Sequence, residues 1–146
     1  MTDETPAVLA GEVNGLMRDM VLMLRRVGAE QPVTAPQLSV LGSLLTGPRR
    51  MSDLAEEHGV RMPTMTVQVN RLERDGLAVR GRDGSDARVV TVALTDEGRE
   101  ALSAGRAHRI DYLAERLARL SPHDRAAIAA AVPALSRMIK GAPTDE

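Results

Sequence analysis

The sequence contains no cysteine among its 146 residues. This absence excludes a disulfide framework, a thiolate metal site, a cysteine nucleophile and a cysteine redox switch. The chain also has no phenylalanine or tryptophan and a single tyrosine, Tyr112. A hydrophobic core must therefore be built from leucine, valine, methionine, isoleucine and alanine. Proteins that bind RNA or single-stranded DNA usually stack bases on aromatic side chains, so we set those partners aside.

Signals for secretion, membrane insertion and catalysis are missing as well. The N-terminus lacks the basic segment of a secretory signal, and the apolar run 20–24 is far too short to span a bilayer. There is no G-x-S-x-G, no H-E-x-x-H and no glycine-rich phosphate loop. The histidines have no partner at metal-binding spacing: His58, His108 and His123. We therefore predict a cytoplasmic protein that is not an enzyme and has no membrane partner, no cofactor and no metal site.

Overall charge gives no sign of a nucleic-acid partner, because the formal net charge is −1. Hydrophobic residues make up 43% and charged residues 27% of the chain, which is typical of an ordered globular protein. Between residues 61 and 82, however, five arginines face only two acidic residues: Arg61, Arg71, Arg74, Arg80 and Arg82 against Glu73 and Asp75. A DNA-binding surface would have to come from such local clustering.

Helical patterns occupy the first half of the chain. A helix is predicted over 6–28, with apolar residues at alternating spacings of four and three that form a seam for another helix: Val13, Met17, Met20, Leu24 and Val27. A second helix is predicted from about Thr34 to the Gly47-Pro48 pair. Ser52 and Asp53 are expected to cap a short third helix that ends near His58, and a fourth helix is expected over 61–75.

The period changes from 3.6 to 2 after Gly76, which predicts a two-stranded β-ribbon with a hairpin signal at Asp83-Gly84. A fifth helix is predicted from Thr95 and a sixth from Ser121. Both carry apolar seams: Ile110, Leu113, Leu117 and Leu120 on the fifth, and Ile128, Val132, Leu135 and Ile139 on the sixth. Residues 1–5 and 141–146 are expected to be disordered.

The order of these elements matches a helix-turn-helix followed by a β-ribbon, which is the winged-helix arrangement. On the fourth helix, Met65, Val69 and Leu72 fall on one face and are expected to be buried. The remaining positions are predicted to face DNA: Pro63, Thr64, Thr66, Val67, Gln68, Asn70, Arg71 and Arg74. The first of these would reach base edges in the major groove, and the arginines suit phosphates.

The predicted ribbon carries Arg82, Asp86 and Arg88. Arg88 could be merely solvated, or could pair with Asp86 to stabilise a hairpin. Beside a helix-turn-helix we favour a contact of Arg82 and Arg88 with DNA. Two residues apart on an extended strand, Asp86 and Arg88 would share a face, so that Asp86 could hold Arg88 extended.

The stretches "MTVQVNRLERDGLAVR" (65–80) and "DARVVTVALTDEGRE" (86–100) resemble the MarR family of bacterial transcriptional regulators. The wing signature of that family is matched by Asp86, Arg88, Leu94, Thr95 and Gly98. The resemblance covers roughly residues 6–140. It implies a fourth helix in the major groove, a wing arginine in the minor groove, an obligate dimer made by the terminal helices, and a small, often aromatic and anionic ligand.

Three positions depart from the family pattern. Ala87 stands where many members have a second arginine, Asn70 where aspartate is common, and Pro63 where serine is frequent. The wing therefore carries less charge than in many members, and one side-chain hydrogen bond is absent at the start of the fourth helix.

We thus predict a mainly α-helical protein with a small β-hairpin wing, in which a winged helix-turn-helix (34–95) lies between dimerisation helices (6–33 and 96–140). The expected dimer interface is Val13, Met17, Met20, Leu24, Leu117, Ile128, Val132, Leu135 and Ile139. The predicted function is a homodimeric regulator, a repressor, that binds double-stranded DNA at a near-palindromic operator and responds to a small ligand of the phenolic type. The ligand-binding residues stay unknown. The alternative is a winged-helix module that binds another protein and not DNA.

Overall fold

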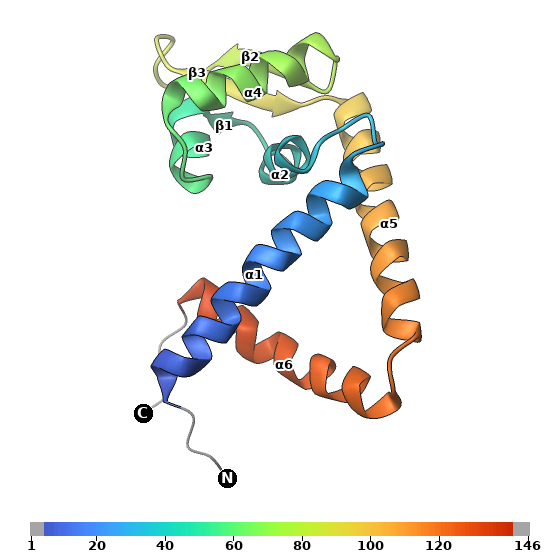
Figure 1. The fold of residues 1–146 in the computed structure, drawn as a ribbon. Coiled ribbons are helices and arrows are strands. Elements are labelled where there is room, and N and C mark those ends of the chain that lie inside the picture. The colour runs from blue at the N-terminus through green and yellow to red at the C-terminus, as the bar shows by residue number, and fades with distance from the viewer. Residues whose placement is uncertain (1–4, 142–146) are drawn as a thin grey trace. The chain divides into compact units, whose positions relative to one another are not determined.

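The structure, a computed structural model, describes residues 5–141 (Figure 1). In chain order its elements are α1 (Pro6–Gly28), α2 (Ala35–Ser43), β1 (Arg49–Arg50), α3 (Met51–Glu57), α4 (Met62–Arg74), β2 (Ala78–Arg82), β3 (Val90–Leu94), α5 (Asp96–Ala118) and α6 (Pro122–Lys140). The chain forms two compact units, Met1–Arg109 and Ile110–Glu146. The predicted fold class, mainly helical with a small β wing, is confirmed. The expected disorder of the termini lies outside the described residues, except at Thr5 and Gly141, which cap α1 and α6.

Helix α2 begins close to the predicted position, after Thr34, and its start is a capping box. The backbone N–H of Thr34 donates to Oε1 of Gln37 at 2.9 Å, and the backbone N–H of Gln37 donates to the Thr34 hydroxyl at 3.4 Å. The helix ends at Ser43 and not at the Gly47-Pro48 pair, so the predicted end is wrong. The residues after Ser43 form turns, and Leu44 in the first of these turns is buried in the core.

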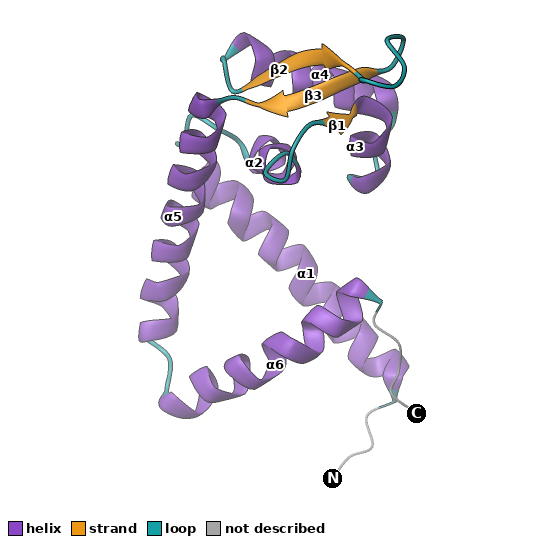
Figure 2. Ribbon diagram, turned by 180° about the vertical axis from the view of Figure 1, so that it is seen from behind, coloured by secondary structure: helices purple, strands orange, loops and turns teal. Residues whose placement is uncertain are grey.

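Two differences from the sequence-based expectation occur together before α3. Arg49 and Arg50 form a third strand, β1, which pairs with β3, so the sheet has three antiparallel strands in the order β1-β3-β2 and not two (Figure 2). This pairing keeps Arg50 extended, and α3 therefore begins at Met51 with Arg50 at its N-cap. The predicted cap at Ser52 is wrong, because Ser52 already lies in the first turn.

The core of the first unit is aliphatic throughout. Its fully buried side chains come from three helices, one strand and the turn after α2: Val40 and Leu41 of α2, Leu44 of the turn, Leu54 of α3, Met65, Val69 and Leu72 of α4, and Val92 of β3. The start of α5 closes over this core through two glycines. A Cβ at Gly98 would overlap the carbonyl oxygen of Leu77, and one at Gly105 would lie 2.6 Å from Cδ2 of Leu38.

The second unit contains the end of α5 and the whole of α6. Ser121 caps α6 by accepting the backbone N–H of Asp124 at 3.1 Å, as predicted, and it donates its hydroxyl to Oδ2 of Asp124 at 2.7 Å. Arg125 closes the turn before it by donating to the carbonyl oxygen of Leu120 at 2.8 Å. Helix α6 has no buried residue, and the same is true of α1 in the first unit.

Candidate nucleic-acid interface

Helix α4 divides into a buried and an outer face as its sequence predicted. Met65, Val69 and Leu72 are at most 1% exposed. Of the residues expected to face DNA, Thr66 and Gln68 are half-buried and the others are exposed: Pro63, Thr64, Val67, Asn70, Arg71 and Arg74. The outer face therefore presents a small polar N-terminal part followed by arginines, the order that major-groove reading with phosphate contacts requires.

The arginines of this outer face are weakly engaged by the protein. Arg74 pairs with the neighbouring Asp75 at 3.4 Å, with both side chains largely exposed. An exposed pair of this kind contributes about 0–1 kcal/mol and is easily exchanged for a phosphate. Arg71 has no ion-pair partner among residues 5–141. Both guanidinium groups are therefore free to contact a polyanion.

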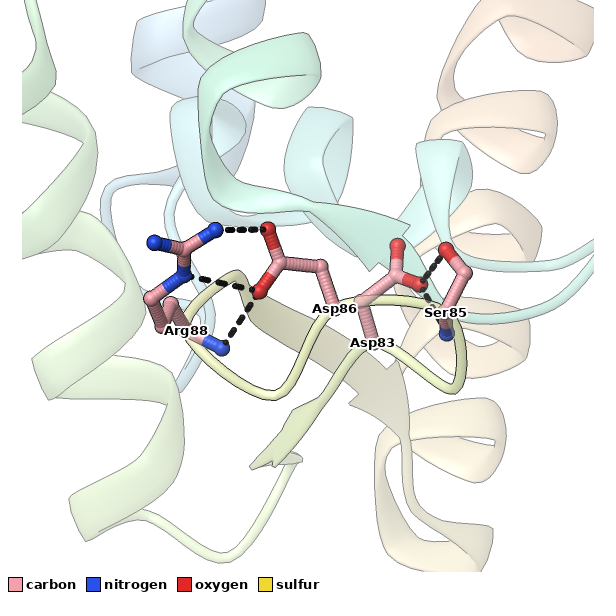
Figure 3. Close-up of polar contacts among 4 residues, drawn as sticks. All are labelled: Asp83, Ser85, Asp86 and Arg88. Carbon is pink, nitrogen blue, oxygen red and sulfur yellow. Dashed lines mark hydrogen bonds and ion pairs between the residues drawn. The ribbon is translucent and has the colours of Figure 1, made fainter.

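The wing loop, residues 83–89 between β2 and β3, is held by Asp83. Its Oδ1 accepts the backbone N–H of Ser85 at 2.8 Å and the Ser85 hydroxyl at 2.6 Å (Figure 3). Its Oδ2 accepts Nε of Arg50 at 2.7 Å. The two bonds from Ser85 and then the Arg50 guanidinium hold the pKa of the Asp83 carboxyl well below its usual range. Arg50 was not predicted as a wing residue. Its only sequence signal is the Arg49-Arg50 pair, which does not indicate a partner on the wing.

Arg88 and Asp86 are paired, as one of the sequence alternatives suggested. Oδ1 of Asp86 accepts the backbone N–H of Arg88 at 3.0 Å and its Nε at 3.2 Å, while Oδ2 accepts Nη2 at 3.4 Å. The bonds from the Arg88 side chain and then from its backbone lower the pKa of the Asp86 carboxyl. The expected strand geometry is wrong, because both residues lie in the wing loop. Arg88 nevertheless projects outward, with its side chain 92% exposed.

Helix α4 and the wing meet at a common recess of about 370 Å³. It is lined by Met51 and Ser52 of α3, Met62 and Thr66 of α4, Arg80 of β2, and Arg88, Val89 and Val90. Two predicted site residues, Thr66 and Arg88, are thus brought together from separate elements. Arg82 does not line this recess and lies instead in a separate recess of about 410 Å³, which it shares with Arg50 and Asp83.

Comparison with known proteins agrees with this geometry. Residues 31–89 match the MarR family. The transcriptional regulator Mb0904 of Mycobacterium bovis, of the helix-turn-helix type, is 30% identical over 141 residues, which cover 96% of this chain and 99% of that regulator. The chain belongs to the MarR family. It is therefore a DNA-binding transcription regulator with a winged helix-turn-helix and not an enzyme, as predicted.

Two further similar proteins match different shares of the chain. The transcriptional repressor MdtR of Bacillus subtilis is 37% identical over 89 residues, or 58% of this chain and 57% of the repressor. The crystal structure of the transcriptional regulator BldR from Sulfolobus solfataricus is 25% identical with a TM-score of 0.73, and the match covers 94% of this chain and 99% of BldR. The DNA contacts of the individual residues of this chain stay predictions.

The part of the chain that the structure describes was also compared with the requirements of a metal site and of a membrane span. Residues 5–141 contain no group of three histidine or acidic side chains that could hold a metal ion. None of the described helices is long and apolar enough to cross a membrane.

Proposed function

We propose that this MarR-family protein is a homodimeric repressor that binds a near-palindromic operator and is released from it by a small anionic ligand. The observation that carries DNA binding is the common recess, where Thr66 of α4 and Arg88 of the wing lie together. Helix α4 would occupy the major groove with Thr64, Thr66, Val67 and Gln68 near base edges. Arg88 would enter the adjacent minor groove, and Arg82 would contact DNA from the separate recess that it shares with Arg50 and Asp83.

The terminal helices carry apolar side chains that are exposed to solvent, and these support a dimer. Ile139 is 76% exposed, Val132 58% and Met17 56%. The other residues of the expected interface are exposed or half-buried: Val13, Met20, Leu24, Leu117, Ile128 and Leu135. Soluble monomers rarely leave contiguous apolar patches of this kind in water, so a second copy of the chain is the expected cover.

A dimer with two-fold symmetry reads two half-sites about one helical turn, roughly 10 bp, apart. Inserting about 5 bp between the half-sites would turn the second α4 to the wrong face of the duplex. We expect tight binding to be lost, as measured by fluorescence anisotropy. Unchanged affinity would contradict simultaneous binding of the two lobes. The similarity to MdtR, a repressor, supports repression. A reporter gene placed behind an operator that the protein selects from random duplexes would test this.

A ligand site is supported by a recess of about 380 Å³ in the first unit. Its lining comes from α2, α3 and α5: Leu38, Ser39, Gly42 and Ser43, then Glu57, then Leu102, Arg106 and Arg109. Two guanidinium groups and two hydroxyls beside leucine side chains suit a small aromatic carboxylate. The Arg106 side chain lies against Gly42, where an added Cβ would come within 3.4 Å of Nη2.

The ligand proposal is tested with a panel of phenolic acids. Arg106→Gln should weaken ligand binding, whereas Arg99→Gln, which removes the same charge from α5 outside the recess, should not. A true effector should weaken operator binding with a coupling of about 1–3 kcal/mol, and the operator must weaken ligand binding equally. A ligand that binds with the same affinity in the presence and absence of operator DNA is not the effector.

A further inference from the structure

The wing loop, residues 83–89, has little packing to hold it in place. Three of its residues are half-buried and the other four are exposed. Strand β1 pairs with β3 only at Arg49 and Arg50, so the ribbon has just two strands where it enters the loop. An isolated two-stranded ribbon is only marginally stable in water. The position of the loop therefore depends on its hydrogen bonds.

Hydrogen bonds inside the loop connect its base to the outward-pointing Arg88. The backbone N–H of Asp83 donates to the carbonyl oxygen of Val89 at 3.0 Å, and the N–H of Val89 donates to the carbonyl oxygen of Asp86 at 3.0 Å. The Asp86 carboxylate accepts the backbone N–H and Nε of Arg88, at 3.0 and 3.2 Å (Figure 3). The place of Asp83 thus determines where the Arg88 guanidinium is presented.

Arg50 fixes Asp83 from outside the loop. Apart from the β2–β3 ladder, the bond from Nε of Arg50 to Oδ2 of Asp83, at 2.7 Å, is the only hydrogen bond among residues 5–141 that joins the loop to another element. The Asp83 side chain is 15% exposed, compared with 41% for Asp75 in the weak pair on α4. Arg50 is itself held in β1, where its backbone pairs with Thr91 of β3.

A loop that is fixed in advance favours DNA binding. A flexible side chain that becomes immobilised in a complex loses conformational entropy, and a side chain that is already positioned avoids this cost. Arg88 extends into solvent with 92% of its side chain exposed, so no packing limits its movement. Its order in the free protein must come from the loop, and the order of the loop from Arg50.

We propose that Arg50 and Asp83 are positioning residues for minor-groove reading: their ion pair fixes the wing loop, so that Arg88 is presented to DNA in one pose. This inference rests on the proposed function, because it requires Arg88 to contact DNA. It adds two residues to those that set recognition, and neither of them needs to touch DNA.

The first test is a double-mutant cycle on the full-length protein with its selected operator. Arg50→Ala should weaken binding about 2- to 12-fold, the ordering cost of one flexible side chain. It should also flatten any preference for flanking A·T pairs. The cost of Arg88→Ala should fall by the same factor in the Arg50→Ala background. An Arg88→Ala cost that is equal in both backgrounds would overturn the proposal and assign Arg50 to a DNA contact of its own.

Two further variants separate positioning from charge. Arg49→Ala removes the same charge from the same strand, but Arg49 pairs with Glu57 of α3 at 3.0 Å and not with the wing. It should leave the cost of Arg88→Ala unchanged. Asp83→Ala breaks the same ion pair without leaving an unpaired carboxylate, and it should lower the cost of Arg88→Ala as Arg50→Ala does. If only Arg50→Ala lowers that cost, the effect comes from the unpaired charge and the proposal is wrong.

The outcomes also distinguish this inference from the proposed function. If Arg88→Ala binds the operator as tightly as wild type, the proposed wing contact fails, and the inference fails with it. If Arg88→Ala weakens binding independently of Arg50 and Asp83, only the inference fails. Thermal melts by circular dichroism establish that each variant folds.

The role of Arg50 is measured in the free protein as well, by NMR order parameters of the backbone amides of Ser85 and Arg88. A rigid backbone has an order parameter of about 0.85, and a flexible one falls below about 0.6. We expect Arg50→Ala to move both amides toward the flexible value and Arg49→Ala to leave them unchanged. A wing loop that stays rigid in Arg50→Ala would overturn the proposal whatever the DNA measurements show.

Discussion

Replacing Gly98 by alanine should destabilise the protein, although alanine is normally the better helix former. Gly98 lies in the first turn of α5, and its N–H donates to the hydroxyl of Thr95 at 3.0 Å. An added Cβ would overlap the carbonyl oxygen of Leu77 and come within 2.9 Å of Cδ1 of Leu94. The obstacle is backbone, so a rotamer change cannot relieve it. The same carbonyl accepts the backbone N–H of Thr95 at 3.2 Å, and that bond would have to lengthen or break.

The size of the effect follows from three contributions. Overpacking of a close-packed core costs about 1–3 kcal/mol. A weakened hydrogen bond adds up to about 1 kcal/mol, and the better helix propensity of alanine returns about 1 kcal/mol. The net loss is therefore up to about 3 kcal/mol. At about 2–4 °C per kcal/mol for a chain of this size, it lowers the melting temperature by up to roughly 12 °C.

Thermal denaturation at one fixed protein concentration measures this loss, because the stability of a dimer depends on concentration. Gly84→Ala is the matched control: it adds the same methyl group in the wing loop, where nothing lies within 4 Å of the new Cβ. It should stay within about 0.5 kcal/mol of the wild type. A Gly98→Ala protein that melts at or above the wild-type temperature would refute the close approach of α5 to Leu77.

Three further outcomes are expected. Arg88→Ala should bind the operator more weakly and lose any preference for flanking A·T pairs, and the slope of log affinity against log salt concentration should fall by about one per lost phosphate contact. Arg88→Lys should restore the charge but little of the preference for a narrow minor groove. Unchanged affinity and slope in a folded Arg88→Ala variant would mean that the wing has only a structural role. Because folding lowers the pKa of Asp83, its contribution to stability is complete above the usual carboxyl pKa of about 3.9 and is lost only as the pH falls through the lower folded value. The amide resonance of Ser85 should therefore titrate with a midpoint below about 3.9. A midpoint near about 3.9 would contradict the hydrogen bonds to Asp83. Leu135→Asp combined with Ile139→Asp should give unfolded or aggregated protein, and a well-folded monomer by light scattering and circular dichroism would exclude the proposed dimer.

Local signals in the sequence determined most of the elements. The bounds of α1, the capped starts of α2 and α6, the buried face of α4 and the change of period after Gly76 all depend on residues within about four positions of one another. The wing signature and the recognition-helix pattern identified the family because they too are short stretches with characteristic residues.

Tertiary structure alone decided the features that join distant positions. Strand β1 has only two residues, too few for a periodic pattern, and it exists because β3 offers a free edge. Arg50 and Asp83 are separated by 33 residues, and nothing near either one indicates the other. The hydrogen bond from Nη2 of Arg80 to Oδ1 of Asn70 likewise forms only because β2 packs beside α4. Helix caps and hydrophobic periodicity act between residues that are close in sequence. The contacts between distant residues form only when the whole unit packs, because packing brings the two partners together.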